Sequence, residues 1–338
     1  KARGGRKAAP RFAVAGTRPL VDKRPMRRLY WSKQRLGAMD MTQLPRMIAV
    51  VGTNASGKSG LGVSLAQRFG GEVISADSRQ VYTGLDMGSG KLTAQEMCGV
   101  PHHLIDVCAP GVFFSMADFQ RLAYAAAEDI LARGKVPFLV GGTGLYIDAV
   151  ADGYVLSDIQ PDLAYRSTLE ALPTEALVQR LDGALPGHGI DPANRNRVMR
   201  ALEKLHDGDT AAPRKQPRYQ VLKLGLTWPR EVLCRRIDER LAARVADGLI
   251  DEVAGLLQRG VSPDFLRRLG LEYRYVSEYL LGQYPAQEAM LAELALAIKR
   301  FAKRQMTWFR RDAGIQWLDV TGDVAAQAAD AVAAFLRG

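Results

Sequence analysis

Short apolar runs alternate with helical patterns in the first half of the chain. Apolar runs bounded by turn residues predict buried strands, and apolar residues at helical spacing predict helices between them. The predicted strands are Met47–Val51, Glu72–Ala76 and Val136–Val140, and the predicted helices are Gly60–Phe69 and Ala117–Arg133. Strands that alternate with helices in this way predict a parallel sheet covered by helices on both faces.

The pattern changes after about Ile159, where helical segments become short and are interrupted by prolines up to Arg218. We interpret residues 159–218 as a small helical insertion. The alternating stretch Tyr219–Leu226 then predicts a strand that returns to the sheet, and Pro229 is well placed to open the next helix. Helices are expected to dominate from there to the end, over Glu231–Asp247, Leu249–Arg259, Ala286–Arg310 and Val324–Leu336.

The positive charge is confined to one end of the chain. The chain has 338 residues and a net charge of +10, and residues 1–40 hold twelve Lys and Arg against Asp22 and Asp40, which accounts for the whole excess. We expect this segment to be a disordered extension, or sequence upstream of a start at Met39 or Met41. An RNA-binding arm or a transit peptide is the alternative. The balanced charge of the remainder means that any RNA surface there must be a local patch.

Composition excludes several classes of protein. With 47% hydrophobic residues the chain can bury a core, so disorder throughout is excluded. Cys98, Cys108 and Cys234 lie far apart without histidines at metal-ligand spacing, which predicts neither disulfides nor a zinc site and fits a reducing cytoplasm. No apolar run is long enough to span a membrane. We therefore expect a soluble, cytoplasmic protein. We also expect a monomer, which does not follow from composition.

The residues Gly52-Thr53-Asn54-Ala55-Ser56-Gly57-Lys58-Ser59 match the phosphate-binding loop pattern GxxxxGK[ST] between a predicted strand and a predicted helix. In such a loop the backbone N–H groups hold an anion. Lys58 is expected to supply a positive charge to the phosphates, and Ser59 to ligate Mg²⁺. The loop alone does not distinguish a nucleoside triphosphate, such as ATP, from an allylic diphosphate.

Polar residues follow two of the other predicted strands. Asp77 comes directly after Glu72–Ala76, and Thr143 follows Val136–Val140. Ligands of open parallel sheets bind beyond the carboxyl ends of the strands, so both side chains should face the crevice that contains the phosphate loop. Taken alone, an Asp-Ser pair is more often a turn or a helix cap. Two such strand ends beside one phosphate loop favour a functional role.

Eight segments in order resemble the signature segments of the tRNA dimethylallyltransferases, also called isopentenyltransferases. The similarity covers roughly residues 47–318. The segments are Gly52–Ser59, Asp77–Tyr82, Gly84–Lys91, Pro101–Asp106, Phe114–Phe119, Gly141–Tyr146, Arg197–Glu203 and Lys303–Trp308. The resemblance implies a P-loop NTPase-like α/β fold whose parallel sheet is flanked by helices. The core would comprise residues 41–158 and 219–338 with the C-terminal helices, and the insertion at 159–218 would contact tRNA.

The resemblance also implies a reaction and catalytic roles. A dimethylallyl group would pass from dimethylallyl diphosphate to the exocyclic amine of the adenosine 3′ of the anticodon, which is flipped out of its loop. Asp77 matches the general base, and Thr143 matches a residue beside the leaving diphosphate. The loop residues Gly52 to Ser59 would hold the diphosphate with Mg²⁺. Arg236 and Arg240 both fall where the family carries a diphosphate-binding arginine, and the sequence does not decide between them.

Contacts to the tRNA anticodon stem-loop are implied for two further groups of residues. One group is Ser78 and Gln80, and the other is a helical stretch of cations and aromatics that includes Lys299, Arg300, Lys303, Arg304 and Gln305. Such a stretch can grip an RNA backbone and stack on bases. It can equally be an amphipathic helix with solvated charges. The segment Gly270-Leu-Glu-Tyr273 departs from the family's usual Gly-Tyr-Arg, which weakens the RNA assignments.

Three other functions compete with this hypothesis. An adenylate isopentenyltransferase would prenylate AMP, ADP or ATP, but it would need neither the helical insertion nor the basic helix. A P-loop small-molecule kinase would use Asp106 to hold a metal and would turn over ATP. An RNA-binding switch that only senses phosphate would have no need of Asp77. His102 and His103 lack metal-ligand spacing and are expected to be structural.

Overall fold

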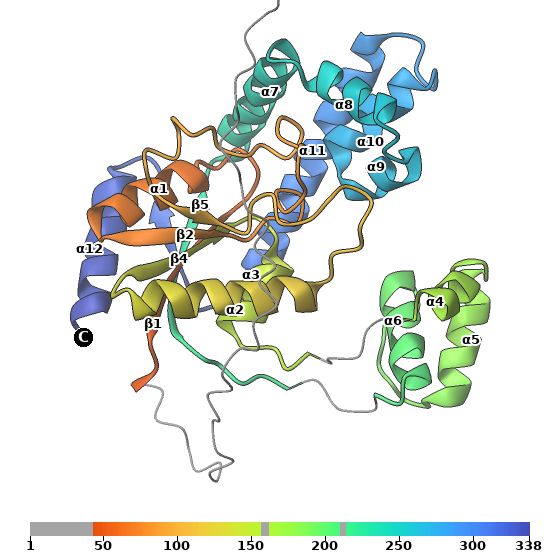
Figure 1. The fold of residues 1–338 in the computed structure, drawn as a ribbon, viewed down its shortest axis with the longest axis horizontal. Coiled ribbons are helices and arrows are strands. Elements are labelled where there is room, and N and C mark those ends of the chain that lie inside the picture. Colours follow the sequence, from red (N-terminus) through yellow and green to blue (C-terminus); the bar gives the residue numbers. More distant parts are fainter. Residues whose placement is uncertain (1–42, 157–161, 210–213) are drawn as a thin grey trace, which may run out of the picture. The chain divides into compact units, whose positions relative to one another are not determined.

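The computed structural model describes residues 43–156, 162–209 and 214–338. The basic segment at residues 1–40 therefore lies outside the described residues. The described residues belong to one compact unit, which is built on a parallel sheet (Figure 1). No described helix combines the length and the apolar character needed to cross a membrane.

Over the described residues the sheet has six parallel strands in the order β3-β2-β4-β1-β5-β6. Their bounds are β1 Arg46–Gly52, β2 Gly71–Ser75, β3 His102–His103, β4 Val136–Gly141, β5 Gln220–Thr227 and β6 Ile315–Asp319. β1 lies between β4 and β5, with Val51 in register with Gly141 and Gly225. Because all strands run the same way, their carboxyl ends lie at one edge of the sheet.

Helices cover both faces of the sheet (Figure 1). Apolar side chains of α1 (Lys58–Arg68) and α12 (Val324–Arg337) pack on one face. Those of α2 (Met116–Ala132), α3 (Gly144–Ala151) and the end of α11 (Gln287–Phe309) pack on the other face. Both faces of the sheet are therefore shielded from water, as expected for strands that are apolar along their whole length.

A second group of helices packs around α11. These are α7 Arg230–Ala246, α8 Leu249–Gln258, α9 Pro263–Leu269 and α10 Leu271–Leu280. They share a hydrophobic cluster in which Tyr273, Leu249 and Leu294 are fully buried. The same cluster includes Val81 and Leu85 from the loop after β2. The cluster thus holds that loop against α7 and α10.

In its described part the insertion consists of three helices with a small core of their own. They are α4 Leu163–Glu170, α5 Thr174–Ala184 and α6 Arg195–His206. Their cluster contains Leu169, Leu177, Leu181 and Val198, all fully buried. The helical character of this segment agrees with the sequence, whereas its contact with tRNA stays a prediction.

The predicted strands and long helices are confirmed to within a few residues. Ser115 caps α2 as expected, since its hydroxyl accepts a hydrogen bond from the Asp118 amide while the Asp118 carboxylate accepts one from the Ser115 amide. The sequence analysis missed β3, α3, α9 and α10. Helices dominate after β5 as expected, and the sequence analysis also missed β6, which extends the sheet beyond β5.

Candidate active site

The phosphate loop connects the end of β1 to the start of α1. Two of its residues adopt left-handed backbone conformations, Ala55 with φ 60° and Gly57 with φ 93°. Such a conformation is uncommon for alanine and marks a constrained turn. The turn directs the first N–H groups of α1, which have no intrahelical acceptor, toward one point beyond the strand. This arrangement suits an anion.

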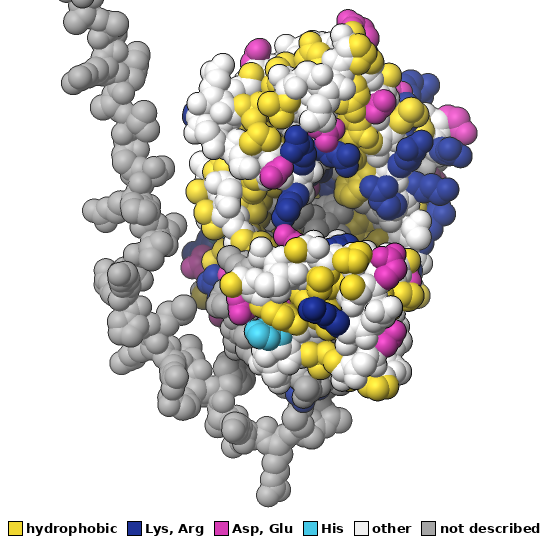
Figure 2. All heavy atoms as spheres, turned by 90° about the vertical axis from the view of Figure 1, so that its right-hand side faces the viewer, with side chains coloured by type: hydrophobic (Ala, Val, Ile, Leu, Met, Phe, Trp, Pro, Cys, Tyr) yellow, Lys and Arg dark blue, Asp and Glu magenta, His cyan; other side chains and the backbone are white. Residues whose placement is uncertain are grey.

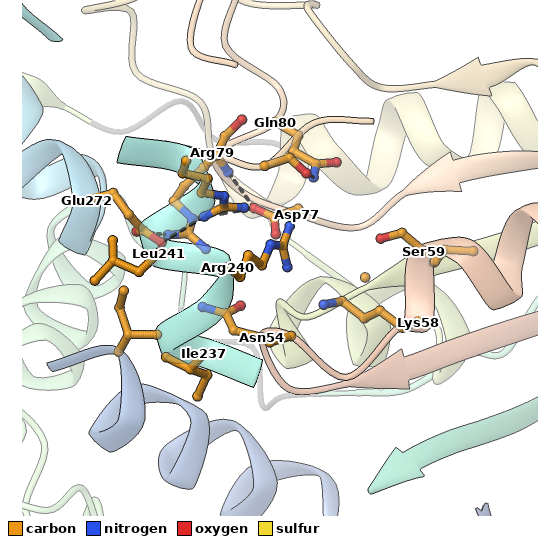
Figure 3. Close-up of a pocket in the computed structure, with 17 residues that line it drawn as sticks. Asn54, Lys58, Ser59, Asp77, Arg79, Gln80, Ile237, Arg240, Leu241 and Glu272 are labelled. Carbon is orange, nitrogen blue, oxygen red and sulfur yellow. Dashed lines mark hydrogen bonds and ion pairs between the residues drawn. The ribbon is translucent and has the colours of Figure 1, made fainter. Parts of the chain in front are cut away.

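Lys58 begins α1 and is buried inside the loop. Its Nζ donates a hydrogen bond of 3.2 Å to the carbonyl oxygen of Thr53. Burial lowers the pKa of Lys58 to about 8, although Asp77 opposes the shift. The ammonium group therefore lacks most of its hydration and can gain from an anionic ligand. In Figure 3 it points into the pocket that Asp77 and Arg240 also line.

Asp77 and Thr143 lie side by side at the ends of β2 and β4. The Asp77 Oδ1 accepts a hydrogen bond of 3.0 Å from the Arg79 amide. Thr143 Oγ1 accepts one of 3.1 Å from the amide of Ser78. Only 13% of the Asp77 side chain is exposed, and within the described chain no hydrogen bond engages its Oδ2. The second carboxylate oxygen is thus available to a ligand.

A buried network of arginines surrounds this carboxylate. The buried Glu272 of α10 accepts hydrogen bonds from Arg79 at 2.8 Å and from Arg244 at 3.2 Å. Both arginines line the pocket together with Lys58 and Arg240. Figure 3 shows Arg79 between Glu272 and Asp77. Burial lowers the pKa of Arg244, and Glu272 partly offsets this. One buried carboxylate therefore holds two guanidinium groups in fixed positions beside Asp77.

Both arginines that the sequence left undecided line a cavity along the phosphate loop, but only Arg240 also lines the pocket that contains Asp77. Arg240 lines the pocket, and among the described residues no carboxylate lies within ion-pair distance of it. Its side chain reaches solvent, yet desolvation by the surrounding protein lowers its pKa to about 10, with a further contribution from Arg244. Arg236 instead donates to the Ala55 carbonyl at 2.9 Å and lies over the Trp228 ring. Arg240 is thus the better diphosphate candidate, and Arg236 supports the loop.

The loop over residues 84–91 closes the pocket from another side. The Glu252 carboxylate of α8 accepts hydrogen bonds from three consecutive amides, those of Asp86, Met87 and Gly88, at 2.8, 2.7 and 3.1 Å. Tyr273 donates to the same carboxylate at 3.0 Å and accepts from the Ser89 amide. These bonds hold the loop against α8 and α10.

Glycine is required at position 90 of this loop. A Cβ there would lie 1.7 Å from an Arg244 nitrogen and 2.5 Å from an Arg240 nitrogen, and the backbone has φ 66°. Any side chain would displace both guanidinium groups. The loop backbone thus helps to shape the cationic part of the pocket.

The donors present fit a Mg²⁺ ion held mainly by a bound diphosphate. Among the described residues no group of three His, Cys, Asp or Glu side chains could hold a metal on its own. Ser59 and Asp77 line the pocket and supply oxygen atoms. Mg²⁺ typically takes one or two protein oxygens together with substrate phosphates and water. These residues can therefore complete a Mg²⁺ site only when a phosphate ligand is present.

Comparison with known proteins agrees with this geometry. The family model described as IPP transferase matches residues 80–312. A tRNA dimethylallyltransferase 2 of Shewanella sediminis is 46% identical over 296 residues, which cover 85% of this chain and 97% of that protein. The chain belongs to the IPP transferase family.

Solved structures of IPP transferases share the fold. The tRNA isopentenylpyrophosphate transferase from Bacillus halodurans has a TM-score of 0.67 and 40% identity, with 86% of this chain and 97% of that chain covered. A eukaryotic dimethylallyltransferase acting on tRNA has a TM-score of 0.71 at 24% identity, covering 86% and 79% of the two chains. The second comparison concerns the fold alone.

The residues expected to contact tRNA occupy two different environments in this IPP transferase. Arg300, Lys303 and Arg304 are exposed on α11, and Lys299 is half-buried and paired with Asp238 at 2.7 Å. Lys and Arg side chains gather on the side of the molecule where α8–α11 lie (Figure 2). These positions are compatible with contact to an RNA backbone.

Ser78, Gln80 and Gln305 lie apart from that exposed group. Ser78 is bonded to Thr143, as described above. The Gln80 amide accepts from Ser75 at 2.7 Å and donates to the Gly90 carbonyl at 3.1 Å. Gln305 is buried, with only 7% of the residue exposed. Direct contact between Gln305 and tRNA would therefore require α11 to move.

Sequence reasoning missed Arg79, Arg244 and Glu272 as site residues. Arg244 could have been found, because it follows Arg240 by one helical turn and must lie on the same face of the helix. Arg79 stands inside a segment of the resemblance but has no pattern of its own. Glu272 lies in the departing segment, and nothing in the sequence relates it to Arg79, from which it is 193 residues distant.

Proposed function

We propose that the chain transfers a dimethylallyl group from dimethylallyl diphosphate to the exocyclic amine of the adenosine 3′ of the anticodon in tRNA. The observation that supports this proposal most is that Lys58, Asp77 and Arg240 all line the same pocket. It combines an anion site with a carboxylate acceptor, which the two halves of the reaction need. The names of the relatives agree with this proposal.

The proposed reaction divides between the two ends of the pocket. The bond between the allylic carbon and the diphosphate oxygen breaks, and its electron pair leaves with the diphosphate. The loop amides, Lys58 and Arg240 stabilise the charge that develops there. Mg²⁺, when bound through Ser59 and the diphosphate, would add a further positive charge.

The other half of the reaction forms the new bond. The amine nitrogen bonds to the allylic carbon, and one of its protons passes to Asp77. An adenine amine is a weak nucleophile because its lone pair is delocalised, so a nearby proton acceptor matters. Thr143 fixes the backbone beside Asp77 through Ser78. The carboxylate is therefore held in place before the substrates arrive.

The decisive experiment compares acceptors. The protein is mixed with labelled dimethylallyl diphosphate, Mg²⁺ and either unmodified tRNA or AMP, and label in the nucleotide is measured. We expect transfer to tRNA alone. A tRNA with guanosine in place of the target adenosine is the control and should stay unlabelled. Transfer to AMP would favour an adenylate isopentenyltransferase, and turnover of ATP without transfer would favour a kinase.

A further inference from the structure

Gln305 lies buried between the two loops that form the pocket. It belongs to α11, and its Oε1 accepts a hydrogen bond of 2.9 Å from the amide of Asn54. Its Nε2 donates one of 2.9 Å to the carbonyl oxygen of Gly142. One side-chain amide thus uses its acceptor on the phosphate loop and its donor on the loop after β4.

These two loops carry the two ends of the proposed reaction. Asn54 lies in the phosphate loop, and Gly142 directly precedes Thr143. The Thr143 amide donates a hydrogen bond of 3.2 Å to the carbonyl of Ala76, and its hydroxyl accepts one from the amide of Ser78. Thr143 is therefore hydrogen-bonded to the backbone on both sides of Asp77. Hydrogen bonds and the peptide link between Gly142 and Thr143 therefore connect the phosphate loop through Gln305 to the Asp77 segment.

The packing leaves Gln305 little freedom to move. A Cβ on Gly142 would lie 2.7 Å from Gln305 Nε2 and 3.4 Å from Lys58 Cε, so position 142 must be glycine for the amide to approach. One turn further along α11, Trp308 donates a hydrogen bond of 2.9 Å to Asp148 of α3. The helix is therefore fixed to α3 close to the point where Gln305 enters.

We infer that Gln305 is a positioning residue that sets the phosphate loop at a fixed distance from Asp77. The allylic carbon must lie within reach of the amine while the diphosphate remains in its cradle, so a small shift between the loops slows the reaction steeply. This role differs from the direct tRNA contact expected from the sequence, which stays a prediction. It rests on the proposed function for its effect on turnover.

The test replaces Gln305 by methionine, which is similar in size but makes neither hydrogen bond. The matched control is Gln283→Met, because Gln283 is exposed in the turn before α11 and its side chain makes no hydrogen bond in the described chain. We expect Gln305→Met to lower kcat on the order of 10-fold to 100-fold, with KM for tRNA within about twofold. Gln283→Met should match the parent.

A double-mutant cycle with Asp77→Asn tests whether the two residues act together. If Gln305 aligns Asp77, the combined loss should be smaller than the product of the single losses. Independent effects, or an effect that appears only in tRNA affinity, would overturn the inference. Should Gln305→Met not fold by circular dichroism, Gln305→Glu, which keeps the acceptor for Asn54 but loses the donor to Gly142, is measured in the same way. It should also lower kcat while the KM for tRNA stays within about twofold.

A second readout does not depend on turnover. Calorimetry measures the affinity for inorganic diphosphate with Mg²⁺, which should weaken by several-fold in Gln305→Met because Asn54 is no longer held. Unchanged diphosphate affinity would overturn the inference, even where the parent shows no transfer to tRNA. Absent transfer by the parent counts against the proposed function only.

Discussion

The cations of the pocket and the cations of α11 belong to the same residue types but differ in their surroundings. Lys58 and Arg79 are buried, and Arg244 is held by Glu272. Arg300, Lys303 and Arg304 stand exposed on α11. Burial lowers the pKa of Lys58 and of Arg244 in the pocket. Water has already been removed from the pocket group, whereas the α11 group keeps its hydration.

This difference gives the two groups different uses. Charges fixed in a poorly solvated pocket interact strongly with charge that develops during a reaction, and they need little rearrangement at that moment. Exposed charges interact through water and ions, so each contributes little and salt weakens it. We therefore expect changes in the pocket to affect kcat, and changes on α11 to affect tRNA binding and its salt dependence.

The largest effect is expected for Asp77→Asn. Asparagine keeps the shape of the side chain but cannot take a proton from the amine. General-base contributions are typically about 10²–10⁴-fold, so kcat should fall by that amount while tRNA binding changes little. Single-turnover rates and tRNA affinity are measured separately. A loss that disappears at saturating tRNA would place Asp77 in RNA binding instead.

Lys58→Ala should have the next largest effect. It removes the buried ammonium group that faces the diphosphate, and removal of one preorganised group of this kind costs on the order of 10²-fold in kcat. Steady-state kinetics with dimethylallyl diphosphate measure the loss. Turnover equal to that of the parent would mean that the loop holds something other than the reacting diphosphate.

The site residues that the sequence predicted are those that directly follow a strand in the sequence. Gly52–Ser59, Asp77 and Thr143 each follow an apolar strand, and parallel strands bring their carboxyl ends to one edge. Knowing the strands was therefore enough to bring these residues together. The same reasoning predicted the sheet and its covering helices, because apolar periodicity is a local signal.

The parts that were missed depend on tertiary packing. β3 is only two residues long, His102–His103, and it is a strand because it pairs with β2. Glu272 joins Arg79 and Arg244 only after α7 and α10 have packed around the loop that follows β2. Gln305 was grouped with its charged neighbours, although its helical spacing from Ile298 and Ala302 already indicates the buried face of α11. Only tertiary packing sets that face against the phosphate loop.

Arg240→Ala and Arg236→Ala form a matched pair within one helix. Arg240 faces the pocket, so its removal should lower kcat by about 10-fold or more. Arg236 supports the loop through Ala55 and Trp228, so its removal should lower the melting temperature with a smaller loss of turnover. Kinetics and thermal unfolding of both variants show which arginine acts on the diphosphate and which stabilises the loop. A larger kinetic loss for Arg236→Ala would reverse the assignment.

The smallest effects are expected for Arg300→Ala and Lys303→Ala on the exposed face of α11. If each side chain contacts a tRNA phosphate, tRNA affinity should fall a few-fold, and the slope of log affinity against log salt should decrease by about one per contact. The reason is that each lost contact leaves one condensed counterion on the RNA. Binding titrations between low and moderate salt measure the slope, and Glu288→Ala, an exposed change near the start of the same helix, is the control. An unchanged slope in both variants would mean that the charges on α11 are only solvated, and that the tRNA is held elsewhere.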